Sequence, residues 1–200
     1  MSHPIDEIKT KEELTPEFEA AFRELIAERP YRKGDTISAM NDMRSHLFYI
    51  MSGSARVYYI SGGKEHTYSF AFENEYISLS YPLLKDSDYV TTIEFLEPTL
   101  VATVPIEKIQ LLLRQYDPVS IGFVIKEMIK GMMKQMSMLE ERILVLQTYS
   151  AKEKFEWMVN RYPKILERAN LTQIASYLGV TKETLYRIRS GKYRGVSPKK

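Results

Sequence analysis

The spacing of apolar positions changes twice along this chain and predicts three regions. Between residues 31 and 105, short runs rich in Tyr, Phe, Ile, Val and Thr alternate with turn-forming segments such as the Gly62-Gly63 pair. Many short strands separated by turns are typical of a β-barrel or a β-sandwich. On both sides of this region, apolar residues recur every three or four positions, which is the period of an amphipathic helix.

One helix is predicted ahead of the strands, over residues 5–27. Thr15 is a suitable N-cap, Pro16 occupies the first helical position, and Pro30 is expected to end the helix. The strands that follow are predicted over residues 47–51, 55–60, 66–72 and 89–95.

A much longer helix is predicted over residues 117–149. Its apolar positions step by four and three residues without interruption over three heptads, which is the a/d pattern of a coiled coil. A helix of about 30 residues is about 45 Å long, more than a small neighbouring domain can cover, so we expect a partner helix. A core helix packed within one chain is the alternative. The seam consists of Ile125, Ile129, Met132, Met136, Leu139, Ile143 and Leu146.

Residues 171–189 predict two short helices joined by a tight turn. Apolar residues keep helical spacing up to Leu178, Gly179 suits a left-handed turn position, and Thr181 is a candidate N-cap for the second helix. The small Ala175 allows the helices to approach, and Leu185 fills their interface. This arrangement resembles the helix-turn-helix of DNA-binding proteins. An ordinary helical hairpin is the alternative.

Positive charge is concentrated at the C-terminal end. Residues 181–200 contain seven Lys or Arg and one Glu, a balance of +6, whereas the whole chain carries only +2. The first 180 residues therefore sum to −4. A basic segment beside a helix-turn-helix is suited to the phosphates of nucleic acid.

Several classes of function are not expected from the composition. The chain has no cysteine, so disulfides, thiolate metal sites and cysteine catalysis are excluded. The three histidines are scattered, and no nucleophile–base pair, metal-ligand spacing or phosphate-cradling loop is visible. We therefore expect no catalysis, no metal and no cofactor. No apolar run approaches a membrane span and no secretory signal is visible, which favours a cytoplasmic protein without a membrane partner.

Three sequence marks resemble the β-roll of cyclic-nucleotide-binding domains. They are residues 32–35 (Arg-Lys-Gly-Asp), residues 47–54 (Leu-Phe-Tyr-Ile-Met-Ser-Gly-Ser) and the hairpin at residues 62–65. Together with the C-terminal motif, they give the layout of Crp/Fnr-type transcription regulators. The resemblance implies an α+β fold with an N-terminal, jelly-roll-like β-roll and flanking helices. It also implies a long helix that dimerises in parallel and a C-terminal helix-turn-helix domain, whose wing is reduced or absent because little chain remains for it.

The chain departs from this family at the phosphate-binding positions. Nucleotide-binding members hold the cyclic phosphate with a Gly-Glu-Leu helix start and an Arg-Ser/Thr pair, which supply backbone N–H groups and a guanidinium. The corresponding positions here are Ser78, Leu79, Ser80, Val90 and Thr91. Because an anion buried there would lack a counter-charge, we expect no useful binding of cyclic AMP. The pocket is then vestigial or takes a more apolar ligand.

The resemblance also assigns residues to DNA contacts. Lys182, Glu183 and Arg187 match the side chains that the family uses to read bases, and Glu183 and Arg187 share a helix face. An intrahelical salt bridge between these two is the alternative. Phosphate contacts are expected from Thr172, Gln173, Thr181, Arg189 and Lys192.

The sequence thus predicts a sensor domain over residues 1–117, a dimerisation helix over 118–149 and a DNA-binding domain over 150–200. The predicted function is sequence-specific transcription regulation by a homodimer on palindromic double-stranded DNA, without response to cyclic AMP. RNA polymerase is a further partner that we consider, and the effector is not identified. The alternative is a non-catalytic sensor or interaction module whose helical hairpin binds protein.

Overall fold

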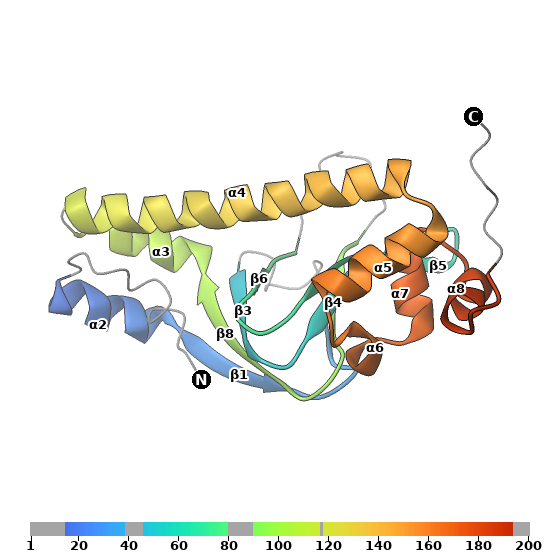
Figure 1. The fold of residues 1–200 in the computed structure, drawn as a ribbon. Coiled ribbons are helices and arrows are strands. Elements are labelled where there is room, and N and C mark those ends of the chain that lie inside the picture. Colours follow the sequence, from blue (N-terminus) through green and yellow to red (C-terminus); the bar gives the residue numbers. More distant parts are fainter. Residues whose placement is uncertain (1–14, 39–45, 80–89, 117, 194–200) are drawn as a thin grey trace.

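The computed structural model describes residues 15–38, 46–79, 90–116 and 118–193. Its centre is a roll of two four-stranded antiparallel sheets, ordered β1-β8-β3-β6 and β2-β7-β4-β5, and helices flank it (Figure 1). The predicted α+β class is confirmed. The strands are β1 (Ala27–Tyr31), β2 (Thr36–Ser38), β3 (His46–Ser52), β4 (Ala55–Ser61), β5 (Lys64–Ala71), β6 (Tyr76–Ile77), β7 (Thr92–Phe95) and β8 (Thr99–Pro105).

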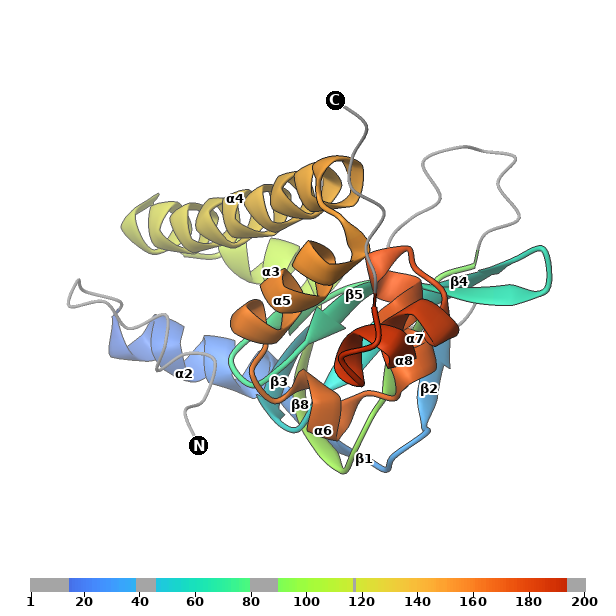
Figure 2. The ribbon, with the colours of Figure 1, turned by 45° about the vertical axis from the view of Figure 1, so that its right-hand side comes forward.

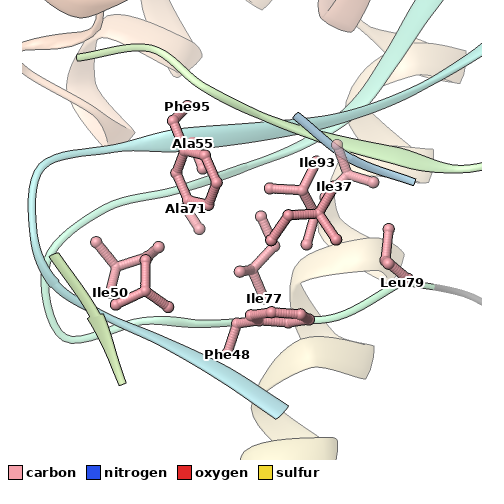
Figure 3. Close-up of a cluster of buried hydrophobic side chains, with 11 residues drawn as sticks. Ile37, Phe48, Ile50, Ala55, Ala71, Ile77, Leu79, Ile93 and Phe95 are labelled. Carbon is pink, nitrogen blue, oxygen red and sulfur yellow. The ribbon is translucent and has the colours of Figure 1, made fainter. Parts of the chain in front are cut away.

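The two sheets enclose an apolar interior (Figure 3). Successive side chains of a strand point to opposite faces, so Ala55 and Val57 of β4 enter the interior while Arg56 between them lies on the outer face. The β4–β5 hairpin turns at Gly62 and Gly63, whose φ angles of 57° and 72° suit the tight turn that the sequence predicts. The interior is lined by Ile37, Phe48, Ile50, Ala55, Val57, Ala71, Ile77, Leu79, Ile93, Phe95 and Val101.

The N-terminal helix is shorter than predicted within the described residues. It is α2 (Pro16–Leu25), capped by the Thr15 side chain, which accepts a hydrogen bond from the Phe18 N–H. Pro30 does not end this helix but lies in β1, at the edge of its sheet, where a residue without an N–H is tolerated. Predicted residues 5–14 of this helix lie outside the described part of the chain.

Two helices continue the chain after the roll. The first, α3 (Ile106–Leu113), was not predicted from the sequence, and it packs with α2 through a cluster that includes Phe18 and Ile109. The second is the long helix α4 (Pro118–Thr148), which runs from α3 at one end of the molecule to the C-terminal helices at the other (Figure 1). Both ends of α4 fall within two residues of the predicted limits. Among the described residues, no helix is both long and apolar enough to cross a membrane.

The C-terminal part consists of short helices. Ser150 and Glu153 form a capping box at the start of α5 (Ala151–Arg161). The remaining helices are α6 (Ile165–Arg168), α7 (Leu171–Leu178) and α8 (Lys182–Arg189). Residues 150–193 contain no strand. The predicted reduction of the wing stays a prediction. Residues 194–200 of the predicted basic tail lie outside the described part.

Candidate nucleic-acid interface

The C-terminal motif is a helix-turn-helix formed by α7 and α8. Asn170 caps α7, Gly179 ends it in the left-handed conformation with φ 63° and ψ 35°, and Thr181 caps α8 by accepting a hydrogen bond from the Thr184 N–H. Leu185 of α8 is completely buried against α7 and α5 in one apolar cluster. The turn at Gly179, the cap at Thr181 and the burial of Leu185 were predicted from local sequence signals, whereas the cap at Asn170 was not.

The three predicted base-reading side chains lie together on the exposed side of α8. Lys182 and Glu183 occupy its first turn, Arg187 lies one turn further along the helix, and all three are exposed. Tyr186, on the same helix, is 64% exposed. An exposed helix with cationic, anionic and aromatic side chains has the donors and acceptors that base edges in a major groove require.

The predicted phosphate contacts fall into two environments. Thr172, Thr181, Arg189 and Lys192 are exposed at the ends of α7 and α8. Gln173 is buried, and its amide oxygen accepts a hydrogen bond from the Asn170 N–H in a capping box at the start of α7. The side chain of Gln173 therefore orders the helix start, and the spacing Asn-x-x-Gln could have indicated this role.

The predicted effector pocket is apolar where the structure describes it. Leu79 is 5% exposed and belongs to the interior cluster of the roll, and Val90 packs against the same cluster. Ser78 is exposed, and Thr91 is half-buried. Ser80 lies outside the described residues. Leu79 thus places hydrocarbon at the position where the resemblance to nucleotide-binding domains leads one to expect an acidic residue.

The predicted dimer seam is largely uncovered on α4. Six of its seven residues are between 41% and 69% exposed, namely Ile125, Ile129, Met132, Met136, Leu139 and Ile143. Leu146 is half-buried, and its Cδ2 atom lies 3.5 Å from the position that a Cβ atom on Gly179 would take. The helix is packed within the chain near its two ends, where Val124 is 8% and Val145 is 1% exposed.

Sequence reasoning missed the contact between the helix-turn-helix and the roll. Phe70 and Leu96 of the roll share one buried cluster with Met158, Ile174 and Tyr177 of the C-terminal helices. Phe70 and its neighbour Ala71 are both 2% exposed although they point to opposite faces of β5. Two consecutive apolar residues in one strand are a signal that both faces are covered.

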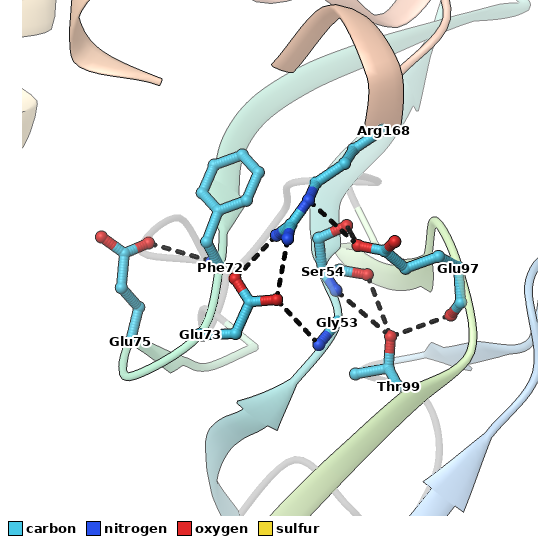
Figure 4. Close-up of polar contacts among 8 residues, drawn as sticks. All are labelled: Gly53, Ser54, Phe72, Glu73, Glu75, Glu97, Thr99 and Arg168. Atoms are coloured by element: carbon cyan, nitrogen blue, oxygen red, sulfur yellow. Dashed lines mark hydrogen bonds and ion pairs between the residues drawn. The ribbon is translucent and has the colours of Figure 1, made fainter. Parts of the chain in front are cut away.

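Polar groups also join the two parts (Figure 4). Arg168 of α6 donates two hydrogen bonds to the carboxylate of Glu73, from Nη1 at 2.7 Å and from Nη2 at 2.9 Å, and its Nε atom lies 3.4 Å from a carboxylate oxygen of Glu97. Burial alone would raise the pKa of Glu73, but the hydrogen bonds from Arg168 lower it below its usual value. The same bonds raise the pKa of Arg168, so both groups stay charged.

Comparison with known proteins finds similarity both in the roll and over most of the chain. Residues 28–116 match the family model described as the cyclic nucleotide-binding domain. The transcriptional activator protein FnrA of Stutzerimonas stutzeri is 24% identical over 172 residues, which cover 80% of this chain and 68% of FnrA.

Solved structures share the fold over most of the chain. FixK2 from Bradyrhizobium japonicum has a TM-score of 0.66 at 19% identity, with 83% of each chain covered. A transcriptional regulator of the crp/fnr family from Eubacterium rectale has a TM-score of 0.65 at 19% identity, with 89% of this chain and 83% of that chain covered. The likeness in fold therefore covers more than four fifths of this chain.

Proposed function

On the premise that this chain has the architecture of a Crp/Fnr-type regulator, we propose that it is a sequence-specific DNA-binding transcription regulator. The observation that carries the proposal is the exposed face of α8, which presents Lys182, Glu183 and Arg187 from a well-capped helix-turn-helix. Residues 1–117 form the β-roll part, residues 118–149 the dimerisation helix and residues 150–200 the DNA-binding part. The cytoplasm is the compartment in which this function operates.

Base reading rests on the chemistry of two side chains on α8. Arg187 can donate a fork of two hydrogen bonds to the O6 and N7 atoms of a guanine, and Glu183 can accept one from the amine of a cytosine. Each such contact contributes about 1–3 kcal/mol of discrimination between bases. Lys182 adds a cation in the first turn of α8, where it reaches a base or a phosphate.

Phosphate contacts fix the position of the protein on the duplex without reading sequence. Thr172, Thr181, Arg189 and Lys192 are exposed around the two helices and can donate to phosphate oxygens. Gln173 contributes through the cap that orders the start of α7. The balance of +6 over residues 181–200 supplies the long-range attraction for the DNA backbone.

The apolar seam on α4 supports the proposal of a homodimer. Six exposed apolar residues along one face of a 31-residue helix are a surface that a second copy of the same helix would bury. A two-fold axis along this seam places two copies of α8 on a palindromic site, with half-site centres about 34 Å apart.

The roll is proposed not to respond to cyclic AMP. With Leu79 and Val90 at these positions, a cyclic nucleotide would find no acidic side chain for its ribose and no guanidinium for its phosphate. Calorimetry with cyclic AMP is expected to show no binding heat. Micromolar affinity would contradict this assignment of the two positions.

The central test is selection of bound sequences from a random double-stranded DNA library, followed by binding titrations of the enriched site. The proposal expects a palindromic consensus and a preference of about 10³-fold or more over unrelated DNA. Absence of any enriched sequence would overturn it. Nonspecific electrostatic binding is excluded by repeating the titration at higher salt, because such binding falls most steeply with salt concentration.

The dimer is tested separately with Ile143→Glu and Met136→Glu, which place a charge in the seam. Light scattering is expected to give a dimer for the unmodified chain and monomers for both variants, with a matched control in Lys134→Glu, where the side chain lies outside the a/d positions. A stable dimer in both seam variants would refute the seam assignment.

A further inference from the structure

We propose that Arg168 and Ser176 are positioning residues that set the spacing between half-sites in the DNA that this protein recognises. Neither residue lies on α8, and both hold the helix-turn-helix in a fixed place on the roll. The inference rests on the proposed DNA-binding function and adds a specificity that the reading residues alone do not provide. The two residues and their partners are here called the clasp.

Ser176 attaches α7 to the edge of a sheet. Among the strands that the structure describes, β5 is the last in its sheet, so none of them pairs with its outward N–H and C=O groups. The Ser176 hydroxyl accepts a hydrogen bond from the Thr67 N–H at 2.9 Å and donates one to the Glu65 carbonyl at 3.1 Å. One hydroxyl thus satisfies two backbone groups of β5 and fixes the helix to a particular point along the strand.

That point is further defined by the strand itself. The pairing of β4 with β5 shifts register between Val57 and Tyr58, so β5 contains an extra residue beside Thr67. The Thr67 side chain is also fixed, because its hydroxyl accepts a hydrogen bond at 2.9 Å from Nη1 of Arg56. Arg56 is 3% exposed. Arg56 is itself paired with Glu65 and Glu94. The attachment site for Ser176 therefore has little freedom to move.

Arg168 makes the second attachment, at the turns of the roll (Figure 4). Its guanidinium is bidentate to Glu73 and approaches Glu97 through Nε. Both carboxylates are held by the roll, since Glu73 accepts a hydrogen bond from the Gly53 N–H and Glu97 accepts one from the Ser54 hydroxyl. A planar fork between two fixed carboxylates restrains direction as well as distance.

A third attachment links the motif to the proposed dimer axis. Arg142 of α4 donates a hydrogen bond at 3.0 Å to the Tyr177 carbonyl near the end of α7, and its guanidinium lies over the Tyr177 ring at 4.5 Å. The helix that carries the two-fold seam therefore contacts the helix that carries Ser176. Through this contact, the position of α7 relative to the dimer axis is set within one chain.

These contacts determine how far apart the two copies of α8 lie in a dimer. A DNA-binding domain on a free hinge would sample many separations, and the dimer would accept half-sites at several spacings with similar affinity. A domain fixed at several points presents one separation. The ordering entropy is then lost on folding rather than on binding, and only DNA with the matching spacing gains the second half-site contact.

The test is a titration of palindromic sites that differ only in the number of base pairs between half-sites. The intact protein is expected to bind the best spacing about 10-fold or more tightly than spacings two base pairs longer or shorter. Ser176→Ala and Arg168→Gln are expected to reduce this ratio to about 3-fold or less, mainly by weakening binding at the best spacing. Unchanged ratios in both variants would overturn the inference.

Two controls separate positioning from direct phosphate binding. Lys164→Gln removes the same charge from an exposed neighbouring position and is expected to keep the spacing preference. Glu73→Gln breaks the clasp from the side of the roll and is expected to flatten the preference as Arg168→Gln does. If Glu73→Gln instead strengthens binding at all spacings equally, Arg168 acts only as a charge and the inference fails.

A distance measurement without DNA tests the positioning role even if a variant binds DNA poorly. Because the chain has no cysteine, Lys192→Cys provides a single site for a spin label in each protomer. The distance distribution between the two labels is expected to be narrow in the otherwise unmodified dimer and at least twice as broad with Ser176→Ala. Equal widths would contradict the clasp.

The outcomes for the two proposals are distinguishable. If the intact protein selects no DNA sequence, the proposed function fails and this inference fails with it. If it selects a site but shows no spacing preference, or if the clasp variants retain the preference, only this inference fails.

Discussion

The two helices of the helix-turn-helix have the same length but opposite surroundings. In α7 five of eight residues are buried, whereas in α8 only Leu185 is buried. Figure 2 shows α7 between the roll and α8, and α8 on the outside. The difference indicates a division of tasks, in which α7 fixes the motif to the molecule and α8 presents side chains outward.

This division explains where the charged side chains occur. The described basic residues of the motif lie on α8 and just after it, while the outward positions of α7 carry Thr172 and Ser176. The Ser176 hydroxyl is hydrogen-bonded to the backbone of β5. Leu185 is the one side chain that α8 buries, and its contacts fix α8 to the rest of the motif.

Leu185→Ala is expected to have the largest effect on stability. Leu185 is 0% exposed, and loss of a fully buried leucine side chain costs about 2–5 kcal/mol through lost burial and the cavity that remains. Urea unfolding of the full chain measures the change. Tyr186→Ala, one residue further along α8 and 64% exposed, is the matched control and should change the free energy of unfolding by less than about 0.5 kcal/mol. Similar losses in both variants would mean that α8 is not anchored through Leu185.

Arg187→Ala is expected to change recognition and leave the fold intact. The guanidinium is exposed, so unfolding should be unaffected, but about 1–3 kcal/mol of discrimination at one base pair should be lost. Titrations on the selected site and on single-base variants measure this loss. Arg189→Ala, at the other end of the same charge cluster, is the control, since loss of a phosphate contact should weaken binding to all sequences equally. A uniform loss with Arg187→Ala would argue against base reading.

Gly179→Ala tests the junction between the two helices. Its φ of 63° lies in the left-handed region, where a residue with a Cβ atom costs roughly 1–2 kcal/mol. Space alone does not forbid the change, because the nearest atom to the new Cβ would be Leu146 Cδ2 at 3.5 Å. Gly131→Ala in the exposed middle of α4 is the opposite control and should stabilise the helix by up to about 1 kcal/mol. Thermal melting distinguishes the two signs.

The smallest effect on stability is expected from low pH, which protonates Glu73 in the clasp. The pKa of Glu73 is lowered in the folded protein from an ordinary value of 4.5. Its contribution to stability is therefore fully present above pH 4.5 and is lost as the pH falls through the lower, folded value. The difference in melting temperature between the intact protein and Glu73→Gln should shrink below about pH 4. A difference that stays constant down to pH 3 would show that the carboxylate does not contribute as an anion.

The sequence predicts local features of the motif well and long-range contacts poorly. The roles of Gly179 and Thr181 can be predicted because a left-handed turn residue and an N-cap depend only on a few neighbouring residues. Ser176 and Thr67 are 109 positions apart, and Arg168 and Glu73 are 95 apart. No spacing rule connects residues at such separations, so the attachment of α7 to the roll could not be predicted.

Pro30 and Gln173 show two further limits of local sequence signals. Pro30 is predicted to end a helix, but an edge strand accepts proline equally well, and the pairing of β1 with β8 decides between the two. Gln173 is predicted to contact DNA phosphate, and its capping-box spacing with Asn170 indicates a structural role that this prediction does not include. The exposed seam on α4 follows from its heptads, while its partner stays a prediction.

The buried cluster that joins Phe70 and Leu96 to the last helices has a consequence for synthesis of the protein. The ribosome completes β5 long before α7 emerges, so the nascent chain carries an uncovered strand edge with aromatic side chains beside it. During that interval we expect the exposed edge to favour association with chaperones and with other nascent chains. A truncated product that ends after α4 would keep this surface permanently, and we expect it to aggregate rather than persist as an independent sensor domain.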